Sequence, residues 1–326
     1  MGGGGGRGDL SRTYAGGAVS SPGFEAEHFV PPSQEETTRA VDLVIEEHVS
    51  HLVPPTREVR ELGEAKEAIQ SSLSRELSLE GVNVVGSVAK RTQICRPTGN
   101  DIDVEFVLNQ ERHGDWLTQP NGPRNCLTKV RETLATEPRF SNIDFSVDRN
   151  TVTAQFGRSR VDIIPAFRHP DGGVLIPDTS GGQRWIRTNP RMSKRILEEK
   201  DRRWGGQVTQ TIKIAKAWSD RHRGPSSIHV EAMVQDYFDH KPQNGDNSSR
   251  TNVQEFFTRL PWYVQNPSYE PAYHQRVDTY LTPDERSRVI AKAERTAAKV
   301  RRAEKVARRA DNSDAAAEAF REVLDG

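Results

Sequence analysis

The sequence predicts an α+β protein built of two lobes, a mixed α/β half followed by a helical half. Between residues 79 and 167, short runs rich in β-branched residues recur between turn residues, with a helical repeat among them. From residue 192 onward, apolar residues recur only at helical spacing. The 326 residues suffice for both lobes, and no apolar run approaches the length of a membrane span.

The N-terminal part of the chain predicts a tail, two helices and the first strands. Residues 1–32 are rich in glycine and serine and are expected to form a flexible tail. Apolar residues at helical spacing in residues 33–79 predict two helices that break near Pro54 and Pro55. Strands are then expected at 81–85 and 102–108, with Ser87 near a helix N-cap between them.

The remaining elements complete the two lobes. After a loop at 109–125, a helix is expected near 126–136, followed by strands at 143–147, 151–156 and 161–164. The helical half is expected to contain helices at 192–203, 207–221, 228–238, 253–260 and 283–310. We therefore expect a catalytic lobe at 33–185, which includes the N-terminal helices, a helical lobe at 186–326, and an active-site cleft between them.

Charge and cysteine content limit the classes of partner and location. Lysine plus arginine and aspartate plus glutamate both total 46, so the net charge is zero and no general attraction to nucleic acid or membrane is implied. Cys95 and Cys126 form no CxxC pair and no zinc ligand set. A reduced, cytoplasmic setting is expected.

Two aspartates stand one residue apart in "VVGSVAKRTQICRPTGNDIDVEFVL", residues 84–108. Residues i and i+2 of a strand share a face, so Asp101 and Asp103 would project side by side. Asp162, in "SRVDIIPAF", heads another predicted strand, and pairing of the two strands would bring three carboxylates together. Such like charges need a cation, and two Mg²⁺ ions, or Mn²⁺ in their place, would meet that need.

Gly86 and Ser87 add a turn suited to phosphate. Glycine allows a phosphate to approach the backbone, and the start of a helix offers amide N–H groups beside the serine hydroxyl. Gly-Ser alone is usually an ordinary turn, and a lone acid is usually solvated. Their order along the chain, Gly-Ser, then Asp-x-Asp, then Asp on a later strand, indicates metal and nucleotide binding.

This order resembles the nucleotidyltransferase superfamily that shares the DNA polymerase β palm. The segment "TIKIAKAWSDRHRGPSSIHVEAMVQDYF", residues 211–238, is similar to the corresponding helices of the CD-NTase family of bacterial cyclic oligonucleotide synthases. The resemblance covers roughly residues 40–326. It implies a palm, that is, a mixed sheet with flanking helices, followed by a C-terminal helical lobe.

The resemblance also implies roles for single residues. Asp101, Asp103 and Asp162 match the metal-binding catalytic acids, and Asp162 would aid deprotonation of the attacking hydroxyl. The matching nucleotide-binding positions are Gly86, Ser87, Lys213, Lys216 and Ser227. Ile228 departs from the family pattern, because cyclic GMP-AMP synthase has a base-stacking tyrosine there.

The implied activity is nucleotidyl transfer that releases pyrophosphate. ATP, GTP or other nucleoside triphosphates would be joined into a cyclic di- or trinucleotide second messenger, in bacterial defence against phage. The implied partners are an effector activated by the cyclic product and a regulatory protein, with no membrane. The alternative is a template-independent RNA 3′-end nucleotidyltransferase of the CCA-adding or poly(A) kind, which would need a basic track for RNA. The basic residues of the 283–310 segment would supply it, whereas a solvated amphipathic helix is the simpler interpretation.

Overall fold

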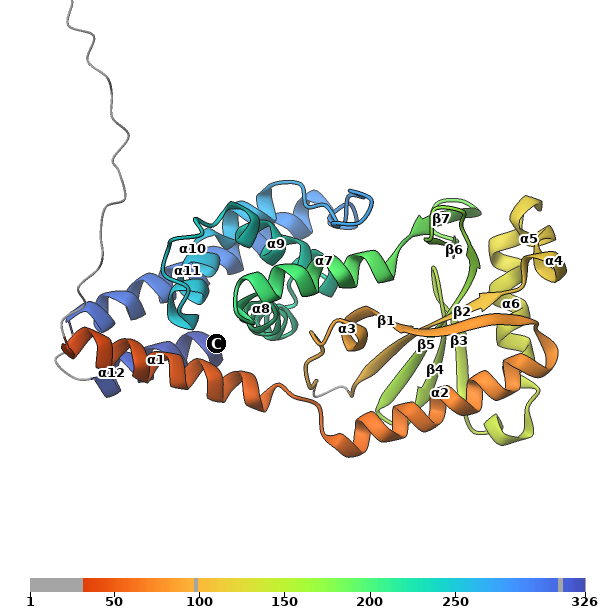
Figure 1. Cartoon of the computed structure of the whole chain (residues 1–326), viewed down its shortest axis with the longest axis horizontal. Helices are drawn as coiled ribbons and strands as arrows, with labels where there is room; N and C mark the ends of the chain where they lie inside the picture. The colour runs from red at the N-terminus through yellow and green to blue at the C-terminus, as the bar shows by residue number, and fades with distance from the viewer. Residues whose placement is uncertain (1–31, 97–98, 310–312, 326) are drawn as a thin grey trace, which may run out of the picture.

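A sheet lobe and a helical lobe lie side by side in the computed structural model of the chain (Figure 1). The structure describes residues 32–96, 99–309 and 313–325. The expected tail at 1–32 therefore lies, except for Pro32, outside the described residues. The two-lobed α+β fold predicted from the sequence is confirmed.

The sheet lobe contains seven strands with helices packed around them. Its helical elements are α2 (Thr56–Glu76), α3 (Gly86–Ala89), α4 (Gln110–His113), α5 (Asp115–Thr118), α6 (Gly122–Ala135) and the 3₁₀ turn η1 (Pro138–Phe140). Its strands are β1 (Leu79–Val85), β2 (Asp101–Leu108), β3 (Asp144–Val147), β4 (Val152–Phe156), β5 (Ser159–Arg168), β6 (Val174–Asp178) and β7 (Arg184–Thr188).

The order of the strands places β2 and β5 side by side in the middle of the sheet. Five strands follow the order β1-β2-β5-β4-β3, while β6 pairs with the end of β5 and with β7. β2 and β5 are parallel, and their shared register sets Asp103 opposite Asp162. The inner face is continuous, with Ile102, Val104, Val161 and Ile163 all buried. Because side chains alternate along a strand, the aspartates then lie on the opposite face.

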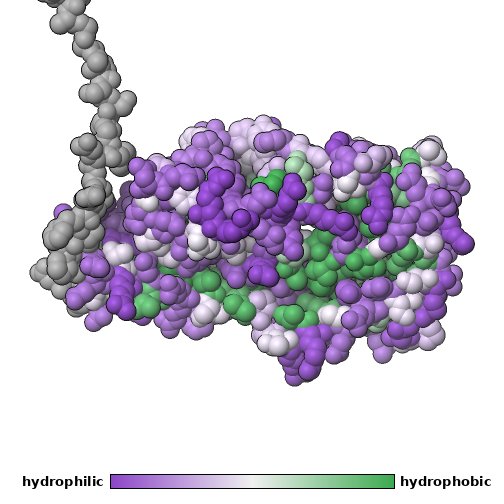
Figure 2. Space-filling model, in the orientation of Figure 1, coloured by the Kyte–Doolittle hydropathy of each residue, from purple (hydrophilic) through white to green (hydrophobic). Residues whose placement is uncertain are grey.

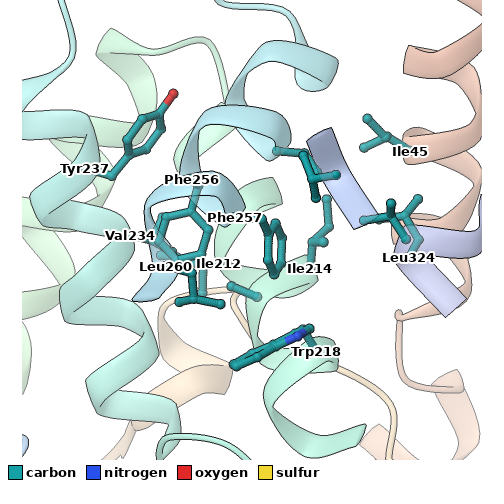
Figure 3. Packing of buried hydrophobic residues seen from close by; sticks show 14 of the residues in the cluster. Ile45, Ile212, Ile214, Trp218, Val234, Tyr237, Phe256, Phe257, Leu260 and Leu324 are labelled. Carbon is teal, nitrogen blue, oxygen red and sulfur yellow. The ribbon is translucent and has the colours of Figure 1, made fainter. Parts of the chain in front are cut away.

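Seven helices form the helical lobe within the residues that the structure describes. They are α1 (Pro32–His51), α7 (Pro190–Arg203), α8 (Gln207–His222), α9 (Ser227–His240), α10 (Ser249–Gln265), α11 (Pro283–Arg309) and α12 (Ser313–Asp325). Aromatic and aliphatic side chains fill its core, with Phe256, Phe257 and Leu260 of α10 against Ile212 and Trp218 of α8 (Figure 3). The aromatic stretch at 256–264 is therefore largely packing, as its helical spacing suggests.

Helix α1 packs in the helical lobe, whereas the expected domain division assigns it to the catalytic lobe. Val41, Val44 and Ile45 of α1 belong to the core of the helical lobe, together with Phe320 and Leu324 of α12. Figure 1 shows that, of the two N-terminal helices, α1 lies beside α12 and α2 extends along the sheet. Assigning both N-terminal helices to the catalytic lobe was thus wrong for α1. Its apolar stripe is equally compatible with a sheet or with helices, and tertiary packing selects the helices.

Three further local differences separate the structure from the sequence-based expectations. The expected loop at 109–125 contains the one-turn helices α4 and α5. Strands β6 and β7 were not predicted; glycines at 172–173 and 181–182 flank these short segments and are typical of loops. Ser87 lies inside α3 as its second residue, and Val85 occupies the N-cap position.

The exposed face of the molecule is uneven in character. Figure 2 shows hydrophobic residues gathered mainly over the sheet lobe, while the helical lobe is largely hydrophilic in the same view. In the described parts of the chain, no helix combines the length and the apolar character needed to cross a bilayer.

Candidate active site

Three predicted acids lie at the start of the two central parallel strands. Asp101 and Asp103 begin β2, and Asp162 is the fourth residue of β5. The register pairs Asp103 with Asp162 and Asp101 with Arg160. The two strands pair, as expected from the sequence, and their parallel direction brings the acids to one end of the sheet.

The carboxylates influence each other's protonation. Burial, followed by the nearby charges of Asp162 and Asp101, raises the pKa of Asp103 to about 7. Burial also raises the pKa of Asp162, although a hydrogen bond of 2.7 Å from Thr153 Oγ1 to Asp162 Oδ1 opposes the rise. The site therefore concentrates negative charge that a cation would stabilise.

Two arginines that the sequence analysis did not assign contact the acids. Arg96 Nη1 donates to both carboxylate oxygens of Asp101 at 3.2 Å, and Arg160 Nη2 donates to Asp101 Oδ2 at 3.1 Å. Arg160 Nε also lies 3.4 Å from Asp162 Oδ2. The strand alternation of "SRVDIIPAF" could have placed Arg160 on the face of Asp162. Arg96 lies in a loop, so no periodic signal identifies it.

The acids fit a hard divalent cation by their chemistry, because carboxylate oxygens are the ligands that Mg²⁺ prefers. Within the described part of the chain, however, no three His, Cys, Asp or Glu side chains form a ready-made metal site. Asp101 is held by guanidinium groups and Asp162 by Thr153. Binding of a metal would therefore exchange some of these hydrogen bonds for metal ligation.

Gly86 lies against the carboxylate of Asp103. Val85 pairs with Asp103 across β1 and β2, and the chain then turns at Gly86 with φ at +63°. A Cβ atom at Gly86 would lie 2.9 Å from Asp103 Cγ and closer still to Oδ2. Glycine is required here both for the left-handed conformation and for the close approach.

Ser87 follows in a helix of a single turn. Its carbonyl oxygen accepts a hydrogen bond of 2.9 Å from the Thr92 N–H, which closes the turn after α3. Because a single helical turn has only a small macrodipole, the backbone N–H groups and the serine hydroxyl are the main groups of this segment that could bind phosphate. The glycine-serine turn and Asp103 consequently form one contiguous surface.

The two candidate lysines of α8 have different surroundings. Lys213 is half-buried, and burial lowers its pKa while Asp201 opposes the shift. Lys216 is 2% exposed and its Nζ contacts Glu231 Oε1 at 2.6 Å and Thr92 Oγ1 at 3.0 Å. The structure thus gives Lys216 buried protein partners, where the resemblance implied a direct contact to the triphosphate.

Ser227 begins α9 at the boundary between the lobes. Its Oγ accepts a hydrogen bond of 3.0 Å from Arg96 Nη2, while Arg96 Nε donates to Asp220 Oδ2 of α8 at 2.6 Å. Arg96 therefore connects Asp101 to the helical lobe. The next residue, Ile228, is 49% exposed and offers no aromatic ring at this position.

Cavity size does not point to this site. A cavity of about 450 Å³ lies elsewhere on the sheet lobe, bordered by Arg124 and Arg131 of α6 and by Arg149 after β3. None of the candidate site residues lines it. We place the active site by its acids, the glycine-serine turn and the lobe boundary, since these carry the relevant chemistry.

Comparison with known sequences identifies the first lobe. Residues 44–201 match the family model described as Second Messenger Oligonucleotide or Dinucleotide Synthetase domain, or SMODS. A probable cyclic nucleotide synthase of Bacillus cereus is 26% identical over 216 residues, covering 57% of this chain and 63% of that protein. The cyclic AMP-AMP-AMP synthase of an Acinetobacter species is 23% identical over 211 residues, covering 60% and 58%. The match thus spans less than two thirds of either relative.

Solved structures share the fold over most of the chain. CdnC of Escherichia coli, in complex with a HORMA protein, has a TM-score of 0.62 at 15% identity, covering 88% of this chain and 96% of that one. The cyclic AMP-GMP synthase DncV of Vibrio cholerae has a TM-score of 0.60 at 17% identity, covering 90% and 85%. At such identities the similarity defines the fold.

A mixed sheet with acids at the heads of its central strands, followed by a helical lobe, is the fold that this chain shares with these solved structures. The match to the SMODS model adds a sequence relationship to this similarity of fold. Residues 44–201 match this synthetase domain, in agreement with the resemblance of the chain's motifs to the CD-NTase family.

Proposed function

We propose that the chain is a nucleotidyltransferase that joins nucleoside triphosphates into a cyclic di- or trinucleotide second messenger. The observation that carries the proposal is the position of Asp103, which has Asp162 opposite it and Gly86 against it. Acids for metal and a turn for phosphate thereby share one surface. The names of the two sequence relatives support a cyclic product.

Asp101, Asp103 and Asp162 would hold two Mg²⁺ ions, with Mn²⁺ as a substitute. When bound, the ions would neutralise phosphate charge and lower the pKa of an acceptor ribose hydroxyl. The carboxylates would contribute their oxygens as ligands, and the positive charge would offset the burial and the neighbouring negative charges that together raise the pKa of Asp103.

Other residues of the chain would bind the donor and move the proton. Gly86 and Ser87 would hold its triphosphate, with Ser227 and Lys213 contributing from the helical lobe. Lys216 would contribute as well, through its buried partners. Asp162, beside Asp103 at the head of β5, would aid deprotonation of the attacking hydroxyl. That hydroxyl oxygen would bond to the α-phosphorus, and the bond to pyrophosphate would break.

A cyclic product requires a second transfer that closes the ring. ATP and GTP are the proposed substrates, since DncV has been solved with both. The exposed Ile228 leaves the choice of base to other groups. In the proposed setting of bacterial anti-phage signalling, the product would activate an effector, and a regulatory protein would control the synthase, as the complex of CdnC with a HORMA protein illustrates.

The direct test is incubation with α-³²P-labelled triphosphates and Mg²⁺, with and without RNA. We expect a small product that forms without RNA, resists phosphatase and has the mass of a cyclic di- or trinucleotide. Asp101→Asn with Asp103→Asn should form none. Labelling that appears only on added RNA 3′ ends would instead establish the RNA-tailing alternative.

A further inference from the structure

A buried charged cluster joins the two lobes directly behind the glycine-serine turn. Glu231 of α9 is 4% exposed, and its Oε2 lies 2.8 Å from Lys90 Nζ of the sheet lobe. Its Oε1 accepts 2.8 Å from Thr92 Oγ1 and 2.6 Å from Lys216 Nζ of α8. The cluster thus contains one carboxylate, two ammonium groups and one hydroxyl, drawn from both lobes.

The charge of Glu231 depends on these partners. Burial alone would raise its pKa, but the ammonium groups of Lys216 and Lys90 lower the pKa of Glu231 to about 2. A buried carboxylate without such partners would be strongly unfavourable. The acidic Glu231 stands between Val230 and Ala232 of α9, and a charged residue between apolar neighbours is the sequence signal for such a cluster.

The cluster is linked to the turn by two short steps. Thr92 is fully buried, and its N–H donates to the carbonyl of Ser87 at 2.9 Å. Lys90 closes α3, with its N–H donating to the carbonyl of Gly86 at 3.2 Å. Residues that contact Glu231 through their side chains therefore hold Gly86 and Ser87 through their backbones.

Lys216 has its donors fully occupied inside this cluster. An ammonium group has three N–H donors. Glu231 Oε1, Thr92 Oγ1 and the Thr92 carbonyl at 3.2 Å accept from Nζ. A phosphate could gain a hydrogen bond from Lys216 only if one of these buried bonds broke, which would leave an unsatisfied buried group.

We propose that Glu231 is a positioning residue, which fixes Thr92 and Lys90, and through them the glycine-serine turn, against the helical lobe. Lys216 influences donor binding through Glu231 and Thr92 and does not touch the triphosphate. This inference rests on the proposed function, because it assigns the turn to the donor triphosphate.

The first experiment is a double-mutant cycle on Mg²⁺-ATP binding, measured by calorimetry on folded protein. Glu231→Gln and Lys216→Met should each weaken binding about tenfold, as expected for a charge-assisted hydrogen bond in a network. The double variant should be no more than about twofold weaker than the weaker single variant. Lys200→Met removes an ion pair to Asp239 within the helical lobe and should leave binding unchanged.

Two outcomes of the cycle would overturn the proposal. If the single losses multiply in the double variant, Lys216 contacts the nucleotide independently of Glu231. If both single variants are folded and bind ATP as the wild type does, the cluster serves stability alone. Should Glu231→Gln fail to fold, Thr92→Val should show the loss and Thr92→Ser, which keeps the hydroxyl, should restore binding.

The second experiment does not depend on nucleotide chemistry. Hydrogen exchange of residues 86–95, without nucleotide, should be faster in Glu231→Gln than in the wild type and unchanged in Lys200→Met. Unchanged exchange in Glu231→Gln would refute the positioning role. If exchange is faster in Glu231→Gln but the wild-type protein binds no triphosphate, the proposed function is refuted and the structural link stays intact.

Discussion

Asp103 and Asp162 lie opposite each other in the neighbouring parallel strands β2 and β5. The backbone of Gly86, in the turn after β1, lies against the carboxylate of Asp103. Their positions follow from backbone register, which packing of the strands' inner faces fixes. A shift of either strand by one residue would turn its acid toward the core. Substitutions at this site should consequently separate loss of chemistry from loss of fold.

Asp101→Asn with Asp103→Asn should abolish nucleotidyl transfer while the protein stays folded. Two amides cannot supply the negative charge that ligates a divalent cation. Product formation should be measured together with thermal unfolding, and Asp115→Asn with Asp144→Asn, two exposed acids of the same lobe, is the control. Normal turnover by the folded double variant would show that the site lies elsewhere.

Gly86→Ala should reduce turnover at least about a hundredfold, since displacement of reacting groups by about 1 Å is enough for such a loss. The added methyl group would collide with the Asp103 carboxylate. Gly157→Ala is the matched control, because Gly157 has φ at +59° and a methyl group added there would meet no atom within 4 Å. Equal losses of turnover in both variants would assign the effect to backbone strain alone.

His229→Gln should make stability less sensitive to mild acid. Burial lowers the pKa of His229 from 6.5 to about 4. The unfolded chain therefore binds a proton between these values when the folded protein does not, so stability falls as the pH drops from 6.5 toward 4. At pH 5 this proton uptake by the unfolded chain should lower the free energy of unfolding of the wild type by roughly 2 kcal/mol.

Denaturant unfolding at pH 7 and pH 5 checks this difference between wild type and variant. His240→Gln, at an exposed histidine of the same helix, should retain the full acid sensitivity of the wild type. If His229→Gln loses as much stability between the two pH values as the wild type, burial of His229 does not control the response.

Charge reversal on α11 should separate a cyclase from an RNA-tailing enzyme. Five exposed basic residues form its C-terminal face, Arg301, Arg302, Lys305, Arg308 and Arg309. If substrates bind at the lobe boundary, changing all five to glutamate should leave product formation from triphosphates alone within about a factor of ten. A long RNA would lose phosphate contacts, and its binding would become less dependent on salt.

The control for this variant is a fold check by circular dichroism, because Arg308 pairs with the buried Glu304. A much larger loss, accompanied by a requirement for added RNA and reversed by restoring the basic residues, would favour the RNA-tailing function over cyclic synthesis.

Local sequence patterns predicted most of the helices and strands, together with the three acids of the site. Alternation in "NDIDVEFVL" places Asp101 and Asp103 on one face, and the apolar run of "VDIIPAF" makes Asp162 part of a central strand. Helical periodicity likewise predicted α8 and α9, and it placed Lys213 and Lys216 on α8, while Ser227 directly precedes the predicted range of α9 and was assigned by the resemblance. These features are local, and a period of two or of 3.6 residues encodes them directly.

The contacts between these elements depend on how the two lobes pack. The tertiary structure placed α1 with the helical lobe, joined Arg96 to Asp101 and Ser227, and enclosed Lys216 with Glu231 and Thr92. Apart from the pair of Arg96 and Asp101, which a loop separates, these contacts join residues of different segments of the chain, and their side-chain types allow many partners. A lysine at helical spacing looks alike whether it faces a phosphate or a buried carboxylate, because only the packing of the lobes determines its surroundings.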